Sequence, residues 1–207
     1  MTLKLEEVKL NNIYLDTETS DLKPGQIGQL SLIIESEAGL STRNYYFSIK
    51  SITDGAAQVT GRSVDWYERA SGGKKFAEYA DEIYNIINNQ RIIAHNVKFD
   101  ESFISMELWR CNKTLTIGDR FDTMTSFRNI TKIPSNNGYK NPKLQELVNY
   151  LNINTDEVAK YAQELFSIET NDYHDAIFDT TSMYIACKVW TDIQSGTTNY
   201  IDRFQKK

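Results

Sequence analysis

The stretch IYLDTET, residues 13–19, decides how this chain folds. Its first residues are apolar and β-prone and follow Asn11 and Asn12, which is typical of a buried strand. Asp16 and Glu18 come where that strand should end, and both carboxylates point the same way because alternate strand residues share a face. Two buried like charges are costly unless a cation lies between them, and oxygen ligands suit Mg²⁺ or Mn²⁺. The alternative is that Asp16 caps a turn while Glu18 lies in solvent.

The composition predicts one folded domain. The chain has 207 residues, of which 40% are hydrophobic and 12% aromatic, and this is enough for a sizeable core. Its first residues alternate in character, which is unlike a signal peptide, and no apolar run approaches the roughly 20 residues of a membrane span. We expect a single domain over residues 1–207, with its motifs within about residues 12–190 and a C-terminal tail over residues 191–207. The expected protein is soluble, cytoplasmic and not bound to a membrane.

The charge and the cysteines narrow the function classes. A net charge of −5 argues against a broad surface that coats nucleic acid. It does not exclude nucleic acid as a substrate, because bound divalent ions would reverse the local sign. Cys111 and Cys187 form no CxxC pair, so neither a disulfide framework nor a zinc site is indicated.

Hydrophobic periodicity predicts an α/β fold with a mixed central sheet between helical layers. Further strands are expected over residues 27–36, 43–50 and 91–96, the last of them parallel to the first because a helix intervenes. Helices are expected over residues 64–70, 76–87, 98–110, 144–151 and 155–166, and from residue 173 or 174 onward.

Two segments stay open at this stage. Residues 121–123 fit either the end of a strand or the start of a helix. Residues 128–142 form a long loop with several basic side chains in or beside it, and such a loop is either solvated or in contact with substrate.

Three motifs combine acidic residues with the two histidines of the chain. They are LDTET at residues 15–19, HNVKFD at residues 95–100 and HDAIFD at residues 174–179. The first ends a strand, the second leads from a strand into a helix, and the third begins the last long helix. Because an α/β fold gathers its site at strand ends and helix starts, we expect the three motifs to meet.

In order and approximate spacing, these motifs resemble the three exonuclease motifs of the DEDD superfamily, in its DnaQ-like, histidine-containing DEDDh branch. The resemblance implies a ribonuclease H-like three-layer fold and metal-dependent 3′–5′ exonuclease activity on DNA or RNA, with nucleoside 5′-monophosphates as products. It also implies two Mg²⁺ or Mn²⁺ ions and a substrate with a free 3′ end, which we expect to be single-stranded. A homodimer or a polymerase or replication partner remains open.

The resemblance assigns roles residue by residue. Four acids would hold the two ions, and a histidine would take the proton from the attacking water, since its ordinary pKa of about 6.5 suits a base. The metal ligands would be Asp16, Glu18, Asp100 and Asp179, and the base would be His174. Residues that would contact the terminal nucleotide are Thr17, Thr19, Leu22, Thr60 and Phe99. Leu22 would wedge between the last two bases, although Leu22 and Phe99 also fit core positions.

Helix geometry leaves one assignment open. Asp175 and Asp179 would share a face of a continuous helix, whereas His174 and Asp179 would diverge by about 140°. Either His174 precedes the helix or Asp175 is the real partner, and we favour the first because the family motif puts the ligand at the later position. His95 is expected to have a structural role, hydrogen-bonded to backbone at its strand end.

A second hypothesis is an exonuclease-fold module that binds nucleic acid or a polymerase partner without cutting. The complete set of four acids and His174 argues against it. The chain departs from many family members at residues 20–21, where Ser-Asp follows Thr19, and at Thr60, where proofreading members can carry a histidine. These departures leave the metal ligands in place and the identity of the preferred 3′ end open, and no motif decides between DNA and RNA.

Overall fold

A mixed five-stranded sheet runs through the centre of the computed structural model, which describes residues 10–23, 25–170 and 173–206. The strand order is β3-β2-β1-β4-β5, with β1 antiparallel to β2 and parallel to β4. The strands are β1 (Asn12–Thr19), β2 (Ile27–Ser36), β3 (Gly39–Tyr46), β4 (Arg91–Ala94) and β5 (Asp119–Asp122). The expected parallel pairing of the first and fourth strands is confirmed.

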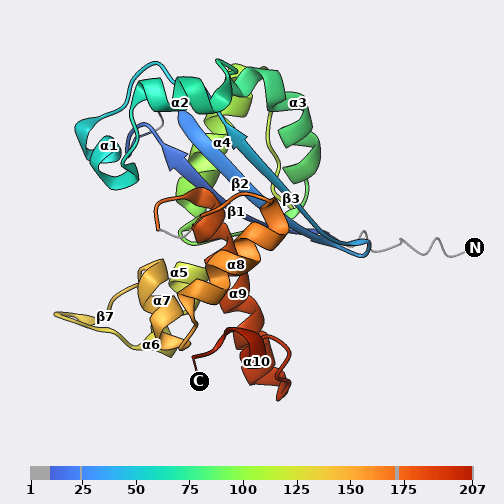
Figure 1. Ribbon diagram of the computed structural model, residues 1–207, viewed down its shortest axis with the longest axis vertical. Coiled ribbons are helices and arrows are strands. Elements are labelled where there is room, and N and C mark those ends of the chain that lie inside the picture. The colour runs from blue at the N-terminus through green and yellow to red at the C-terminus, as the bar shows by residue number, and fades with distance from the viewer. Residues whose placement is uncertain (1–9, 24, 171–172, 207) are drawn as a thin grey trace, which may run out of the picture.

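Helices cover both faces of the sheet, which confirms the expected three-layer α/β fold (Figure 1). One core contains side chains of α3 (Phe76–Ile87) and α4 (Val97–Arg110). The other contains side chains of α7 (Leu144–Tyr150), α8 (Thr155–Phe166), α9 (Ala176–Ser195) and α10 (Ile201–Phe204). The shorter helices are α1 (Asp54–Thr60), α2 (Val64–Ser71), α5 (Thr123–Ser126) and α6 (Arg128–Thr131).

The central strand β1 separates the two cores. Ile13 packs in the core that contains α3 and α4, whereas Tyr14 packs in the core that contains α9. Because side chains alternate along a strand, Asp16 and Glu18 continue the face of Tyr14, and Thr17 continues the face of Ile13. The strand pattern therefore directs both carboxylates toward the layer of α9.

The third strand begins and ends earlier than the expected residues 43–50. Ser36 pairs with Gly39, so β2 and β3 form a tight hairpin, and Gly39 takes a φ of 108° that favours glycine. The amide of Phe47 still donates to the carbonyl of Gly28 in β2, and the chain leaves β2 at Ser48, whose amide donates to the carbonyl of Lys74. Phe47 and Ile49, the apolar residues that suggested a longer strand, are buried in the core.

Both open segments contain regular structure. The strand β5 ends at Asp122 and α5 begins at Thr123, because the Asp122 side chain accepts from the amides of Met124 and Thr125. The expected loop over residues 128–142 contains α6 and a short hairpin of β6 (Pro134–Ser135) and β7 (Gly138–Tyr139). The sequence thus left strand and helix undecided at a place where one follows the other directly.

His95 has the structural setting expected from the sequence. Its Nε2 lies 2.9 Å from the carbonyl oxygen of Pro142, and its Nδ1 lies 2.9 Å from the Thr123 hydroxyl. Burial lowers the pKa of His95, which favours the neutral imidazole. His95 therefore ties the end of β4 to the segments that begin α5 and α7.

The C-terminal residues pack on the rest of the fold. Helix α9 continues to Ser195, so residues 191–195 of the expected tail are helical. Phe204 is buried, and the hydroxyl of Tyr200 lies 2.9 Å from that of Tyr184. Residues 1–9, where we expect no signal peptide, lie outside the described residues, as does Lys207. Among the residues described, no helix is both long enough and apolar enough to cross a membrane.

Candidate functional site

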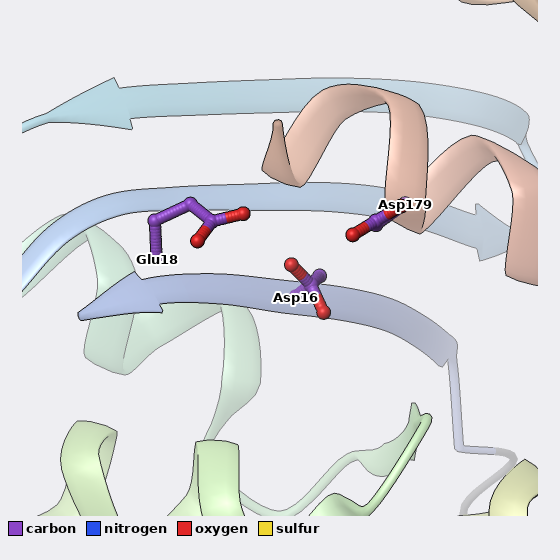
Figure 2. Close-up of side chains that lie close together, drawn as sticks. All are labelled: Asp16, Glu18 and Asp179. Carbon is purple, nitrogen blue, oxygen red and sulfur yellow. The ribbon is translucent and has the colours of Figure 1, made fainter. Parts of the chain in front are cut away.

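Three carboxylates converge where the end of β1 meets the start of α9. Asp16 and Glu18 come from β1 and Asp179 comes from the first turn of α9, and one oxygen of each lies within 4.8 Å of the others. Figure 2 shows the three side chains turned toward one another. They are the first and third acidic motifs of the sequence, brought together as expected.

Asp100 belongs to α4, in the other helical layer, and lies close enough to this group for its charge to act on Asp16. It is 2% exposed, and its Oδ1 accepts a hydrogen bond of 2.8 Å from the Thr17 hydroxyl. Because Thr17 lies between Asp16 and Glu18 on the opposite face of β1, this hydrogen bond brings the second motif next to the first. The fourth predicted ligand is therefore near the group of three without being part of it.

The electrostatics of the site disfavour negative charge. Burial raises the pKa of Asp16 well above its ordinary value, and the charges of Asp100, Asp179 and Glu18 raise it further. Burial and Asp179 also raise the pKa of Glu18, while Arg62 opposes the rise. Burial raises the pKa of Asp100 to about 7, against the hydrogen bond from Thr17. Such a set of buried and half-buried oxygen donors suits a divalent cation, which would compensate the charge.

We expect the metal-free protein to lose stability as the pH rises from about 4 to about 7. In this window the folded state keeps the Asp100 proton and the unfolded state has released it, so folding is favoured at lower pH. Urea unfolding in the presence of chelator would measure this loss. Between pH 5 and pH 8, the free energy of unfolding of wild type should fall by on the order of 2 kcal/mol relative to that of Asp100→Asn. Addition of Mg²⁺ or Mn²⁺ should restore the stability of wild type at pH 8. If the difference in unfolding free energy between the two proteins does not change with pH, the raised pKa of Asp100 is contradicted.

His174 lies in the turn before α9, the position favoured from the sequence. Its φ is 69°, in the left-handed region, and its side chain is exposed. The amide of His174 donates to Oδ2 of Asp179 at 3.2 Å. The next residue, Asp175, is the N-cap of α9, and its Oδ1 accepts from the amide of Ile177 at 2.9 Å. His174 and Asp179 are thus held together at the N-terminal end of α9.

The five predicted substrate residues line one pocket of about 370 Å³ next to the carboxylates. They are Thr17, Thr19, Leu22, Thr60 and Phe99, and Glu18 lines the same pocket. Leu22 is 86% exposed, so its interpretation as a core residue is wrong. Phe99 is partly buried against Phe103, with ring centroids 4.9 Å apart, and combines a packing contact with a place in the pocket wall.

Sequence reasoning missed several residues around the site. Val59 of α1, which is 53% exposed, lines the pocket opposite β1. Arg62, in the turn between α1 and α2, forms an ion pair with Asp175 and also donates to the side chain of Gln29. An arginine between two short helices has the sequence signature of an exposed residue, so only the tertiary structure reveals this contact. Val59 is an apolar residue that belongs to no helical stripe in the sequence, and this was a weak signal for an exposed apolar side chain.

Comparisons with known proteins agree with this geometry. The model of the family described as "Exonuclease" matches residues 13–186, well over half of the chain. DNA polymerase III subunit epsilon of Rickettsia conorii is 30% identical over 131 residues, which are 58% of this chain and 56% of that protein. The 3′–5′ exonuclease DinG of Bacillus subtilis is 27% identical over 139 residues, 65% of this chain and 14% of that protein.

A solved structure is similar over nearly the whole chain. Escherichia coli exonuclease I in complex with a dT13 oligonucleotide superposes with a TM-score of 0.66 at 17% identity, covering 91% of this chain and 42% of that one. This likeness confirms the ribonuclease H-like fold. The chain spans 56% of the length of the epsilon subunit and smaller shares of DinG and exonuclease I.

Proposed function

The chain belongs to the exonuclease family, in its DnaQ-like group, and we propose from this membership that it is a metal-dependent 3′–5′ exonuclease of the DEDDh type. The reaction would hydrolyse the terminal phosphodiester of DNA or RNA and release a nucleoside 5′-monophosphate. One observation carries the proposal: Asp16, Glu18 and Asp179 converge beside a pocket that is open to solvent.

The donor set supports binding of divalent cations, and the proposed mechanism uses two of them. Carboxylate oxygens are hard ligands of the kind that Mg²⁺ and Mn²⁺ prefer, and without a cation their closely spaced charges would repel one another. Asp16, Glu18 and Asp179 would hold the ions, with Asp100 contributing directly or through water. When bound, the ions would stabilise the charge that develops on the phosphate and lower the pKa of the attacking water.

The protein residues would position the reactants and move one proton. His174 would accept the proton of the attacking water at an imidazole nitrogen. The exposure of its side chain supports this role, because a base has to reach solvent and substrate. The Thr17 hydroxyl would keep Asp100 oriented, since it donates to that carboxylate at 2.8 Å.

The pocket beside the carboxylates would receive the 3′-terminal nucleotide. Leu22 and Val59 offer exposed apolar surface at its walls, and apolar or aromatic side chains bind bases without sequence preference. The dT13 oligonucleotide bound by exonuclease I supports a single strand as the substrate. The similarity to a polymerase subunit supports testing for a polymerase partner.

Leu22→Ala is expected to raise KM roughly fivefold and to leave kcat unchanged, because it removes about 1 kcal/mol of apolar contact with a base. Steady-state kinetics on a single-stranded oligonucleotide would measure both constants. Leu40→Ala is the matched control, since Leu40 is a partly exposed leucine of β3 that does not line the pocket. An unchanged KM in Leu22→Ala would remove this side chain from the substrate contact.

The proposed function is tested by a time course with 5′-labelled single-stranded DNA and RNA of matched sequence. Reactions would contain Mg²⁺, Mn²⁺ or chelator. A metal-dependent ladder that shortens from the 3′ end is the expected result, and the faster substrate identifies the sugar preference. Binding of both oligonucleotides without any cleavage would contradict the enzyme hypothesis and favour the non-catalytic binding module.

A further inference from the structure

Arg62 connects the turn after α1 to the start of α9. Its Nη2 pairs with Oδ2 of Asp175, and its Nη1 donates to Oε1 of Gln29. The two side chains of the ion pair are 11% and 19% exposed, so the pair is largely withdrawn from water. The guanidinium lies over the ring of Trp66, 4.3 Å from its centroid. Arg62 is therefore fixed by an acid, an amide and an aromatic face.

Both acceptors of Arg62 also hold the first turn of α9. Asp175 caps the amide of Ile177, and the fully buried Gln29 accepts from the amide of Ala176 at 3.4 Å. Gln29 Nε2 lies 3.3 Å from Oδ1 of Asp175 and closes the network. Arg62, Gln29 and Asp175, which we call the α9 clamp, thus fix the residues between His174 and Asp179.

The position of His174 requires such support. Its left-handed φ of 69° is uncommon for a residue with a side chain, and the surrounding structure has to hold it there. The clamp acts on the adjacent residue, Asp175, and the amide of His174 donates to the carboxylate of Asp179, five residues further along the chain. Loss of the Arg62 charge would leave a partly buried Asp175 carboxylate without its cation, which favours movement of the turn.

We propose that Arg62 is a positioning residue that acts through Asp175 to hold His174 in place, a role that rests on the proposed exonuclease function. Arg62 already serves two acceptors and an aromatic face, and little of its side chain is exposed. A direct contact with a substrate phosphate would require breaking this arrangement. The expected effect is accordingly on the turnover step and not on substrate binding.

The first experiment compares the kinetics of Arg62→Met with those of wild type and Arg43→Met. Arg43 of β3 is the matched control because it forms an exposed ion pair with Glu82 of α3. Arg62→Met is expected to lower kcat by about tenfold to a hundredfold with little change in KM, since a small displacement of a reacting group has effects of this size. Arg62→Lys should recover part of the loss, because one ammonium replaces only part of the fork. A change in KM alone would instead indicate a phosphate contact and overturn the proposal.

The second experiment repeats the Arg62→Met substitution in a His174→Ala background. If Arg62 acts through His174, the double variant should have the kcat of His174→Ala alone. If the two losses multiply, Arg62 acts elsewhere and the proposal is wrong. Should Arg62→Met fail to fold, Asp175→Asn gives the same test, because the amide oxygen can still cap Ile177 while the charge is lost.

Hydrogen exchange of the metal-free protein tests the clamp without any activity. Arg62→Met should speed amide exchange over residues 174–180, and Arg43→Met should leave it unchanged. Unaltered exchange in Arg62→Met would overturn the proposal even where the nuclease is active. If wild type cleaves neither DNA nor RNA, the proposed function fails, and the exchange result still decides whether Arg62 holds this turn.

Discussion

Asp16→Ala is expected to reduce 3′–5′ cleavage by at least about a thousandfold while the chain stays folded. The carboxylate would hold a metal ion that contributes several kcal/mol to the transition state, and each 1.36 kcal/mol corresponds to about tenfold in rate. Folding should persist because the closely spaced carboxylates of Asp16, Glu18 and Asp179 repel one another in the metal-free protein. Removing one of them relieves that repulsion.

The measurement is the labelled-oligonucleotide time course, combined with circular dichroism and thermal unfolding of the same samples. Asp156→Ala is the matched control, since Asp156 is an exposed acid in the first turn of α8. Asp179→Ala should repeat the result of Asp16→Ala, because it removes the ligand contributed by α9. An unfolded Asp16→Ala protein, or a folded one that still cleaves, would contradict the assignment of the metal site.

His174→Ala is expected to slow turnover by roughly 10²-fold to 10⁴-fold while binding of the metal persists. A general base contributes to the proton-transfer step, and it does not contribute to the donor set of Asp16, Glu18 and Asp179. Single-turnover rates would measure the loss, and Mn²⁺ titration followed by electron paramagnetic resonance would measure ion binding. Equal losses of rate and of Mn²⁺ affinity would mean that the substitution disturbs the carboxylates.

Unchanged turnover in His174→Ala would remove this residue from the role of base. His95 is not a substitute, because both of its ring nitrogens already have partners in Thr123 and Pro142. The attacking water would then have to lose its proton to solvent or to a carboxylate.

The residues that could be placed from the sequence are those controlled by local periodicity. The alternation along β1 puts Asp16 and Glu18 on one face whatever the rest of the chain does. The motif spacing then predicts the start of α9, where Asp179 follows His174 by more than one helical turn. The choice of Asp179 as the third ligand, and the expectation that the motifs meet, came from the family resemblance and from where an α/β fold gathers its site.

The residues that could not be placed depend on contacts between distant segments. The end of β3 is decided by the amide of Ser48, which bonds to the carbonyl of Lys74 and leaves β2. The role of Arg62 depends on Gln29 and Asp175, which lie far away in the chain on either side of it. Neither contact follows from a periodic pattern in the sequence, so neither could be predicted from hydrophobic periodicity or motif spacing.

The order of the four acids along the chain has a consequence during synthesis of the protein. Asp16 and Glu18 leave the ribosome early, whereas Asp179 belongs to the last long helix, and Asp100 arrives between them. A nascent chain therefore carries an incomplete set of ligands until α9 has been made and has packed against β1. Hydrolytic capacity would arise only when the fold is nearly complete, so unfinished chains would leave cellular nucleic acid intact.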